Sequence, residues 1–118
     1  MELEKQVVNL ELSKRLKELG VKQDSIWWWV LLEGYFDYQL VRPPIGDKEI
    51  KDCCRAFTVA ELFGKSMDET SLEKATDGEN TYYICKLDIK SGLKFTDRNP
   101  ANALAKMKIY LIENNLIK

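Results

Sequence analysis

The sequence predicts an α+β domain, in which a small antiparallel sheet of two hairpins, with four or five strands, packs with two or three helices. Two observations indicate this class. Amphipathic helical stripes lie near both ends of the chain, and two pairs of β-rich runs, each interrupted at a glycine, lie between them. With 118 residues, of which 45% are hydrophobic, the chain is expected to form a single globular domain over residues 1–118.

The first helix is predicted from its caps and its apolar spacing. Asn9 is a suitable N-cap, and Gly20 stands where a left-handed residue ends a helix. Val21 is then placed to contact Leu16, which is typical of a Schellman ending. The apolar stripe between the caps consists of Leu12, Leu16 and Leu19.

The first hairpin is predicted from two β-rich runs around Glu33-Gly34, which would pair Leu32 with Tyr35. A three-residue bulged loop is the alternative, and it would shift this register. One face then carries only apolar and aromatic side chains and is expected to be core. It contains Trp27, Trp29, Leu31, Phe36, Tyr38 and Leu40. The other face is mixed and is expected to lie nearer to solvent. It contains Trp28, Val30, Leu32 and Tyr35 beside Asp37, Gln39 and Val41.

The middle of the chain is predicted from its breakers and one capping motif. Two prolines after Arg42 make residues 42–47 a loop, and residues 48–57 fit either a helix or a strand, of which we favour a third strand. Thr58 and Glu61 form a capping box, so a helix is expected from Val59, with Phe57 and Leu62 as its hydrophobic staple. Residues 65–80 are polar and acid-rich, which predicts a mobile loop.

The C-terminal third is predicted to be a second hairpin and a long helix. Residues 81–89 alternate between apolar and polar, and residues 93–96 follow as a short partner strand. Asn99 and Pro100 are suited to the N-cap and first position of a helix that continues to about Asn114. Ile109 and Ile112 lie on different sides of that helix, which leaves room for a homodimer.

Several function classes are excluded by composition. The chain has no histidine, so it contains no Ser-His-Asp triad and no His-Glu-x-x-His zinc helix. Its longest apolar run, residues 26–32, is too short to span a membrane, and its first residues lack the pattern of a secretory signal. We therefore expect a cytoplasmic protein with reduced cysteines and no membrane partner.

Isolated fragments of active-site motifs do not add up to a site. Gly64-Lys65-Ser66 ends like a phosphate-binding loop but lacks the earlier glycine. The three cysteines, Cys53, Cys54 and Cys85, lack the fourth ligand and the spacing of a zinc site, and no histidine is present to activate a thiol. We therefore predict a non-enzymatic protein with no catalytic residue, no metal and no cofactor.

Three segments of the chain carry a family resemblance. They are residues 11–25 (ELSKRLKELGVKQDS), 56–62 (AFTVAEL) and 101–114 (ANALAKMKIYLIEN). Together they resemble small hypothetical proteins carried by bacterial prophages and mobile elements. The resemblance covers about a third of the chain and implies a phage or mobile-element setting. It transfers no site residues.

The predicted function is macromolecular binding or self-association, with an unidentified protein or a second copy as partner. The candidate contact surface is the mixed hairpin face, where four apolar or aromatic residues would gather: Trp28, Val30, Leu32 and Tyr35.

The alternative is a small nucleic-acid-binding module. Residues 25–79 hold six basic and eleven acidic side chains, and residues 80–118 hold seven basic and three acidic ones. The basic C-terminal third would then contact phosphates. Its candidate residues are Lys86, Lys90, Lys94, Arg98, Lys106 and Lys108.

Overall fold

The computed structural model describes residues 5–42, 49–63, 70–87 and 92–114. Its elements follow along the chain as α1 (Leu10–Glu18), β1 (Trp28–Leu32), β2 (Gln39–Val41), β3 (Ile50–Arg55), α2 (Val59–Phe63), β4 (Thr70–Asp77), β5 (Asn80–Leu87), β6 (Lys94–Asp97) and α3 (Pro100–Glu113). The α+β class is confirmed. The described strands form two antiparallel sheets, in the orders β2-β1-β3 and β4-β5-β6, where one sheet of four or five strands was expected.

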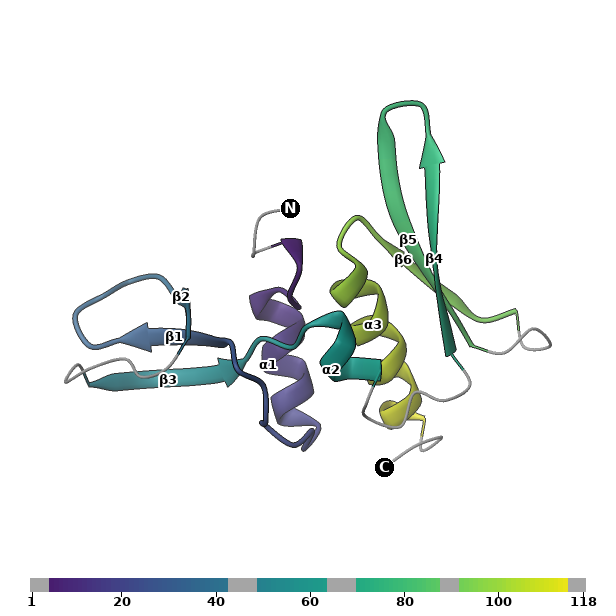
Figure 1. Cartoon of the computed structure of the whole chain (residues 1–118). Coiled ribbons are helices and arrows are strands. Elements are labelled where there is room, and N and C mark those ends of the chain that lie inside the picture. Colours follow the sequence, from purple (N-terminus) through teal and green to yellow (C-terminus); the bar gives the residue numbers. More distant parts are fainter. Residues whose placement is uncertain (1–4, 43–48, 64–69, 88–91, 115–118) are drawn as a thin grey trace.

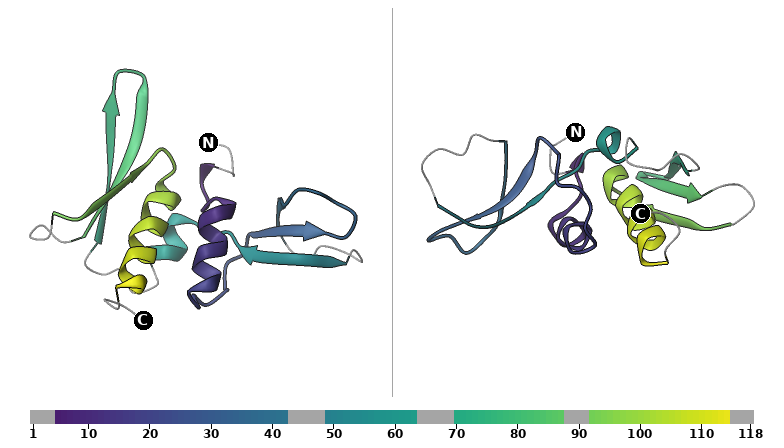
Figure 2. Two further views of the ribbon diagram at one scale, coloured as in Figure 1. Left: turned by 180° about the vertical axis from the view of Figure 1, so that it is seen from behind. Right: turned by 90° about the horizontal axis from the view of Figure 1, so that it is seen from below.

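The three helices lie between the two sheets (Figure 1). Helix α3 is central, because it contacts β5 and β6 on one side and α1 and α2 on the other. The molecule is elongated and rather flat, with extents of 50 × 37 × 21 Å, and the two further views show the sheets at opposite ends (Figure 2).

The main core forms around α3, which is buried on nearly all sides from Pro100 to Leu111. It combines α3 with the apolar stripe of α1 and the inner face of sheet β4-β5-β6. Ile109 belongs to this core, and the half-buried Ile112 packs against it. The apolar breadth of α3 is therefore explained by packing within one chain and no longer indicates a homodimer.

The predicted boundaries of α1 are confirmed. The Asn9 side chain accepts a hydrogen bond from the backbone N–H of Leu12 at 2.9 Å. Gly20 has a φ of 85°, and the backbone N–H groups of Gly20 and Val21 donate to the carbonyls of Lys17 and Leu16. These two bonds are the pair that defines a Schellman motif.

The capping box of α2 is also confirmed. The Thr58 N–H donates to the Glu61 carboxylate at 2.8 Å, and the Glu61 N–H donates to the Thr58 hydroxyl at 3.3 Å. The other oxygen of Glu61 accepts from the Ile26 N–H, and the Ser25 hydroxyl lies 2.9 Å from Glu61 Oε1. The start of α2 is thereby tied to the segment that leads into β1.

The predicted register of the first hairpin is wrong. Trp29 pairs with Leu40, two positions from the expected partner, and six residues connect β1 to β2. The Tyr35 N–H does donate to the Leu32 carbonyl, but Gly34 has a φ of 86° at the second central position of this turn. That sign of φ suits a type II turn, whose twist splays the flanking strands. The chain therefore leaves the sheet before it returns as β2.

The expected burial of the two hairpin faces is wrong as well. Val30 and Leu32, on the face expected nearer to solvent, are buried, whereas Phe36, expected in the core, is fully exposed. Phe36 lies in the connection between β1 and β2 and belongs to neither strand. Helix α1 does not cover it, because the apolar stripe of α1 packs into the α3 core and α1 contacts this sheet through lysines, such as Lys17, which donates to the Cys53 carbonyl at 2.6 Å.

The remaining strands agree in part with expectation. Residues 50–55 form the favoured third strand, and residues 80–87 and 94–97 form the second hairpin. Residues 70–77, expected as a loop, instead form β4, which pairs with β5 without a break and turns through Gly78-Glu79. On this strand Leu72 packs against the core, and Glu73 lies 2.9 Å from Lys86. Cross-strand contacts thus outweigh the weak β propensity of the segment. Residues 65–69 lie outside the described residues.

We expect Asn99→Ala to destabilise the protein by roughly 1–3 kcal/mol, measured by urea unfolding. Asn99 Oδ1 caps the N–H groups of Ala101 and Asn102, and its Nδ2 donates to the buried carbonyl of Val7 at 2.7 Å. The matched control is Asn114→Ala at the exposed end of the same helix, which should change stability by less than about 0.5 kcal/mol. Equal effects of the two variants would contradict the assigned role of Asn99.

Candidate interaction site

The structure separates the four residues of the predicted contact surface. Val30 and Leu32 are buried and offer no surface to a partner, Trp28 is half-buried, and Tyr35 is 44% exposed. The patch that they were expected to form is therefore absent, and Tyr35 alone keeps substantial exposure.

Trp28 is held in place by its cross-strand neighbour Arg55. The guanidinium carbon lies 3.5 Å from the centroid of the indole ring, and Arg55 Nη1 donates to the Ser25 carbonyl at 2.7 Å. The Trp28 indole N–H is buried without a hydrogen-bond acceptor. This stacked pair stabilises the sheet and does not present Trp28 as a free anchor.

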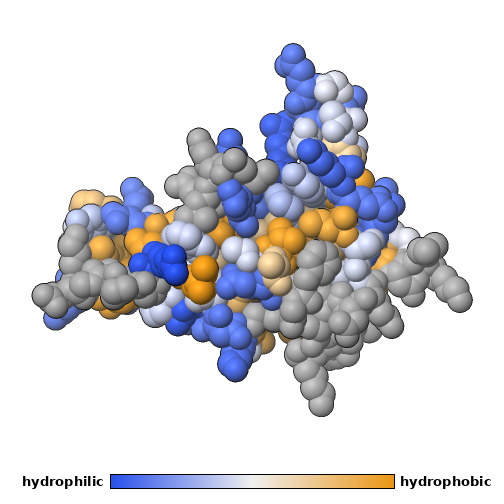
Figure 3. All heavy atoms as spheres, viewed as in Figure 1, coloured by the Kyte–Doolittle hydropathy of each residue, from blue (hydrophilic) through white to orange (hydrophobic). Residues whose placement is uncertain are grey.

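Exposed apolar side chains gather instead at the far end of the same sheet. Phe36 is 100% exposed, Tyr35 44% and Ile50 42%. Ile50 belongs to this end because it pairs opposite Leu32, and because the Glu33 N–H donates to the Glu49 carbonyl at 3.0 Å. We call Tyr35, Phe36 and Ile50 the aromatic tip. Figure 3 shows apolar residues at the surface over this sheet and again around α2 and α3.

The loop that carries Tyr35 and Phe36 is anchored at its base. The Tyr38 hydroxyl donates to the Asp52 carboxylate, and the Lys14 ammonium of α1 lies 4.3 Å from the Tyr38 ring centroid. This hydrogen bond lowers the pKa of Asp52 and, together with partial burial, raises the pKa of Tyr38 to about 12. The base of the loop is fixed, while Phe36 makes no contact that hides it from water.

The alternative basic surface is largely neutralised. Lys86 lies 2.9 Å from Glu73, Lys106 lies 2.9 Å from Asp97, and Lys108 is only 4% exposed. Burial opposes the ionisation of Asp97, but hydrogen bonds from Lys106 and the Asn99 backbone outweigh it and lower the pKa of Asp97. Three of the six candidate cations are therefore paired with a carboxylate or buried, and they do not offer a free charge to a phosphate.

The other three candidate cations do not restore a patch. Lys94 and Arg98 are exposed at the two ends of β6, and Arg98 Nη2 lies 3.4 Å from Asn80 Oδ1. Lys90 lies outside the described residues. Lys94 and Arg98 share no contact, so within the described chain the structure gives the nucleic-acid alternative no continuous basic surface.

The cysteines do not converge. Cys53 and Cys54 are on β3 and Cys85 is on β5, in different sheets. Burial raises the pKa of the Cys54 and Cys85 thiols to about 11, which keeps both protonated at neutral pH. Among the residues described here, no cluster of cysteines and carboxylates could hold a metal ion. Residues 64–66, the phosphate-loop fragment, lie outside the described ranges.

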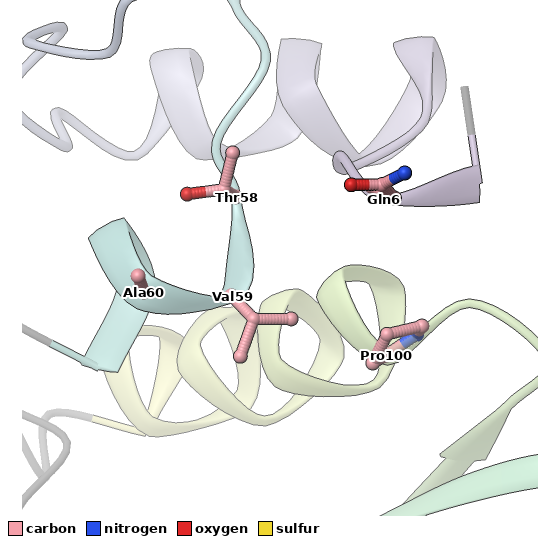
Figure 4. A pocket seen from close by; sticks show the side chains of 5 residues that line it. All are labelled: Gln6, Thr58, Val59, Ala60 and Pro100. Atoms are coloured by element: carbon pink, nitrogen blue, oxygen red, sulfur yellow. The ribbon is translucent and has the colours of Figure 1, made fainter. Parts of the chain in front are cut away.

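A pocket of about 400 Å³ opens between the N-terminal segment, α2 and the start of α3 (Figure 4). Its lining carries no charge, and its side chains come from Gln6, Thr58, Val59, Ala60 and Pro100. These groups contain no nucleophile paired with a base, so the pocket is suited to binding an apolar group rather than to acid–base chemistry.

Comparisons with known proteins place no further constraint on the site. No family model, no curated protein and no solved structure matches the chain significantly. Within the described residues, no helix combines the length and the apolar composition needed to cross a bilayer.

We expect Phe36→Ala to change the free energy of unfolding by less than about 0.5 kcal/mol, since the side chain is fully exposed. Val30→Ala is the control in the same hairpin, and it should cost roughly 2 kcal/mol because Val30 is fully buried. Thermal or urea unfolding measures both. A loss of stability in Phe36→Ala as large as that in Val30→Ala would place Phe36 in the core.

Thiol labelling tests the burial of the cysteines. At pH 8 Cys54 and Cys85 should resist an aromatic disulfide reagent in the folded protein and react fully in urea, because both thiols are buried and protonated. Mass spectrometry of the labelled peptides distinguishes the sites. Fast labelling of Cys85 in the folded state would contradict its position in the core.

Proposed function

We propose that this chain is a non-catalytic accessory protein of a phage or prophage that acts by binding a protein partner through the aromatic tip. The observation that carries the proposal is the complete exposure of Phe36, together with the exposure of Tyr35 and Ile50, at the far end of sheet β2-β1-β3. Removing a phenylalanine side chain from water contributes about 1.5–3 kcal/mol, and folding leaves that contribution unused. Aromatic side chains of this kind dominate many protein interfaces.

Anchoring of the loop supports its use in binding. Because Tyr38 is bonded to Asp52 and contacts Lys14, a partner that contacts Phe36 orders few additional residues. The entropy lost on association is correspondingly smaller than for an unrestrained loop. An aromatic side chain itself has few rotatable bonds and adds little to that cost.

The charges around the tip favour a protein over an anionic membrane. Glu33 and Asp37 flank the two aromatic residues, and no basic residue lies between them. Carboxylates at this position are repelled by anionic lipid headgroups. They are suited to a partner whose apolar pocket has a basic rim. The phage setting is supported by the resemblance in residues 11–25, 56–62 and 101–114.

A photo-reactive phenylalanine analogue at position 36 tests this function. We expect the full-length protein, expressed in its host cell, to form a discrete covalent adduct with a protein on irradiation. The yield should fall when Glu33 and Asp37 are both replaced by Lys, since the acidic rim contributes to recognition. The matched control carries the analogue at Tyr110, an aromatic residue on α3 that is 37% exposed.

The outcomes separate the alternatives. A protein adduct at position 36 that position 110 does not form, and that is weakened by the two lysines, supports the proposed function. Equal adducts at both positions, or none at position 36, overturn it. Adducts to nucleic acid in place of protein would favour the alternative function.

A further inference from the structure

Two residues that line the pocket between α2 and α3 are held in place by their neighbours. Thr58 is held by the capping box of α2 and by an isolated antiparallel bridge to Val7. Pro100 is buried at the first position of α3, directly after the bonded Asn99 cap. A preformed apolar pocket binds a side chain without first reorganising, which favours even a small contact.

The lining of the pocket suits an aromatic ring. Val59 and Pro100 provide apolar walls, and Ala60 leaves an opening to solvent because its side chain is short and exposed. Figure 4 shows the lining side chains around one common space. The volume of about 400 Å³ is at the small end of the range for ligand pockets and is sufficient for one large side chain.

The charges near the pocket complement those near the aromatic tip. Lys5 precedes Gln6 and is exposed, and the exposed Arg98 lies two residues before Pro100, with its Nη2 3.4 Å from Asn80 Oδ1 on β5. Of the neighbouring carboxylates, Asp97 is neutralised by Lys106 at 2.9 Å. Glu61 keeps its negative charge, because the Thr58 and Ile26 N–H groups that donate to it are neutral. The two unpaired carboxylates that flank Phe36, Glu33 and Asp37, have the sign opposite to that of Lys5 and Arg98.

We propose that the partner of the aromatic tip is a second copy of this chain, whose pocket between α2 and α3 receives Phe36. This inference rests on the proposed function, in which the aromatic tip is the contact surface. The tip lies at the outer end of sheet β2-β1-β3, whereas the pocket lies among the central helices (Figure 1), so the ring of Phe36 enters the pocket of another copy. The contact joins two different surfaces and leaves the pair with one unused Phe36 and one unused pocket. Such contacts close into rings or extend into filaments.

A complementation experiment tests this arrangement. Phe36→Ala removes the inserted aromatic ring and keeps the pocket, whereas Ala60→Trp fills the opening of the pocket and keeps Phe36. Wild type should show a mass that rises with concentration beyond that of a dimer. Each variant alone should associate at least about tenfold more weakly. An equimolar mixture of the two should form a heterodimer and nothing larger, because only one productive contact remains.

Sedimentation velocity of the full chain measures these masses, and two variants serve as matched controls. Tyr110→Ala removes another exposed aromatic side chain, and Ala60→Ser changes the pocket residue without filling the pocket. Both should associate like wild type. Higher salt should weaken wild-type association, since the contact pairs acidic and basic groups.

The result also distinguishes this inference from the proposed function. Wild type that stays monomeric at millimolar concentration, while position 36 still crosslinks to a different protein, overturns the second copy as partner and leaves the proposed function standing. Association of Ala60→Trp alone as strong as that of wild type, or a mixture that forms no heterodimer, overturns the pocket as the acceptor. Absence of any protein adduct at position 36 overturns both.

Discussion

The two sheets of this protein are joined through the backbone of Val7, Val8 and Asn9. The Val7 carbonyl accepts from Asn99, the Val8 N–H donates to Phe57, the Val8 carbonyl accepts from the Trp29 indole, and the Asn9 N–H donates to Asn102. These bonds come from α3, from the segment before α2 and from β1. A buried backbone group without a hydrogen-bond partner costs about 1–3 kcal/mol. These hydrogen bonds therefore fix the positions of α3, β1 and the segment before α2 relative to residues 7–9.

This constraint decides which face of α1 meets which neighbour. Since α1 begins directly after Asn9, its apolar stripe lies against α3, and Leu16 is completely buried there. The flank of α1 that remains for sheet β2-β1-β3 carries Lys14 and Lys17. Lysines cover a sheet less completely than leucines do, because their ammonium groups stay in water. The sheet is therefore anchored near α1, and its far end is left with exposed apolar side chains.

The features predictable from sequence are those that depend on a few neighbouring residues. The Schellman ending at Gly20 and the caps by Asn9 and Asn99 follow from local hydrogen bonds, which short motifs encode. The register of the first hairpin depends on the φ of Gly34, and its contacts with Lys14 and Lys17 come from α1, which is distant in sequence; neither is encoded in the hairpin residues alone. For the same two reasons the exposure of Phe36 could not be predicted from the sequence. No sequence signal in residues 33–38 distinguishes an aromatic residue in a strand from one in a loop.

The same segment also forms one side of the pocket between α2 and α3. Gln6 lines it, and the bridge between Val7 and Thr58 sets the distance between this segment and the start of α2. Asn99, which bonds to the Val7 carbonyl, fixes Pro100 on the opposite wall. One set of hydrogen bonds thus keeps the pocket open and, by directing the leucines of α1 toward α3, leaves the aromatic tip uncovered. Because both surfaces depend on residues 7–9, a change that loosens this segment would alter the aromatic tip and the pocket together. Changes at Phe36 or Ala60 alter one of the two surfaces and leave the other intact.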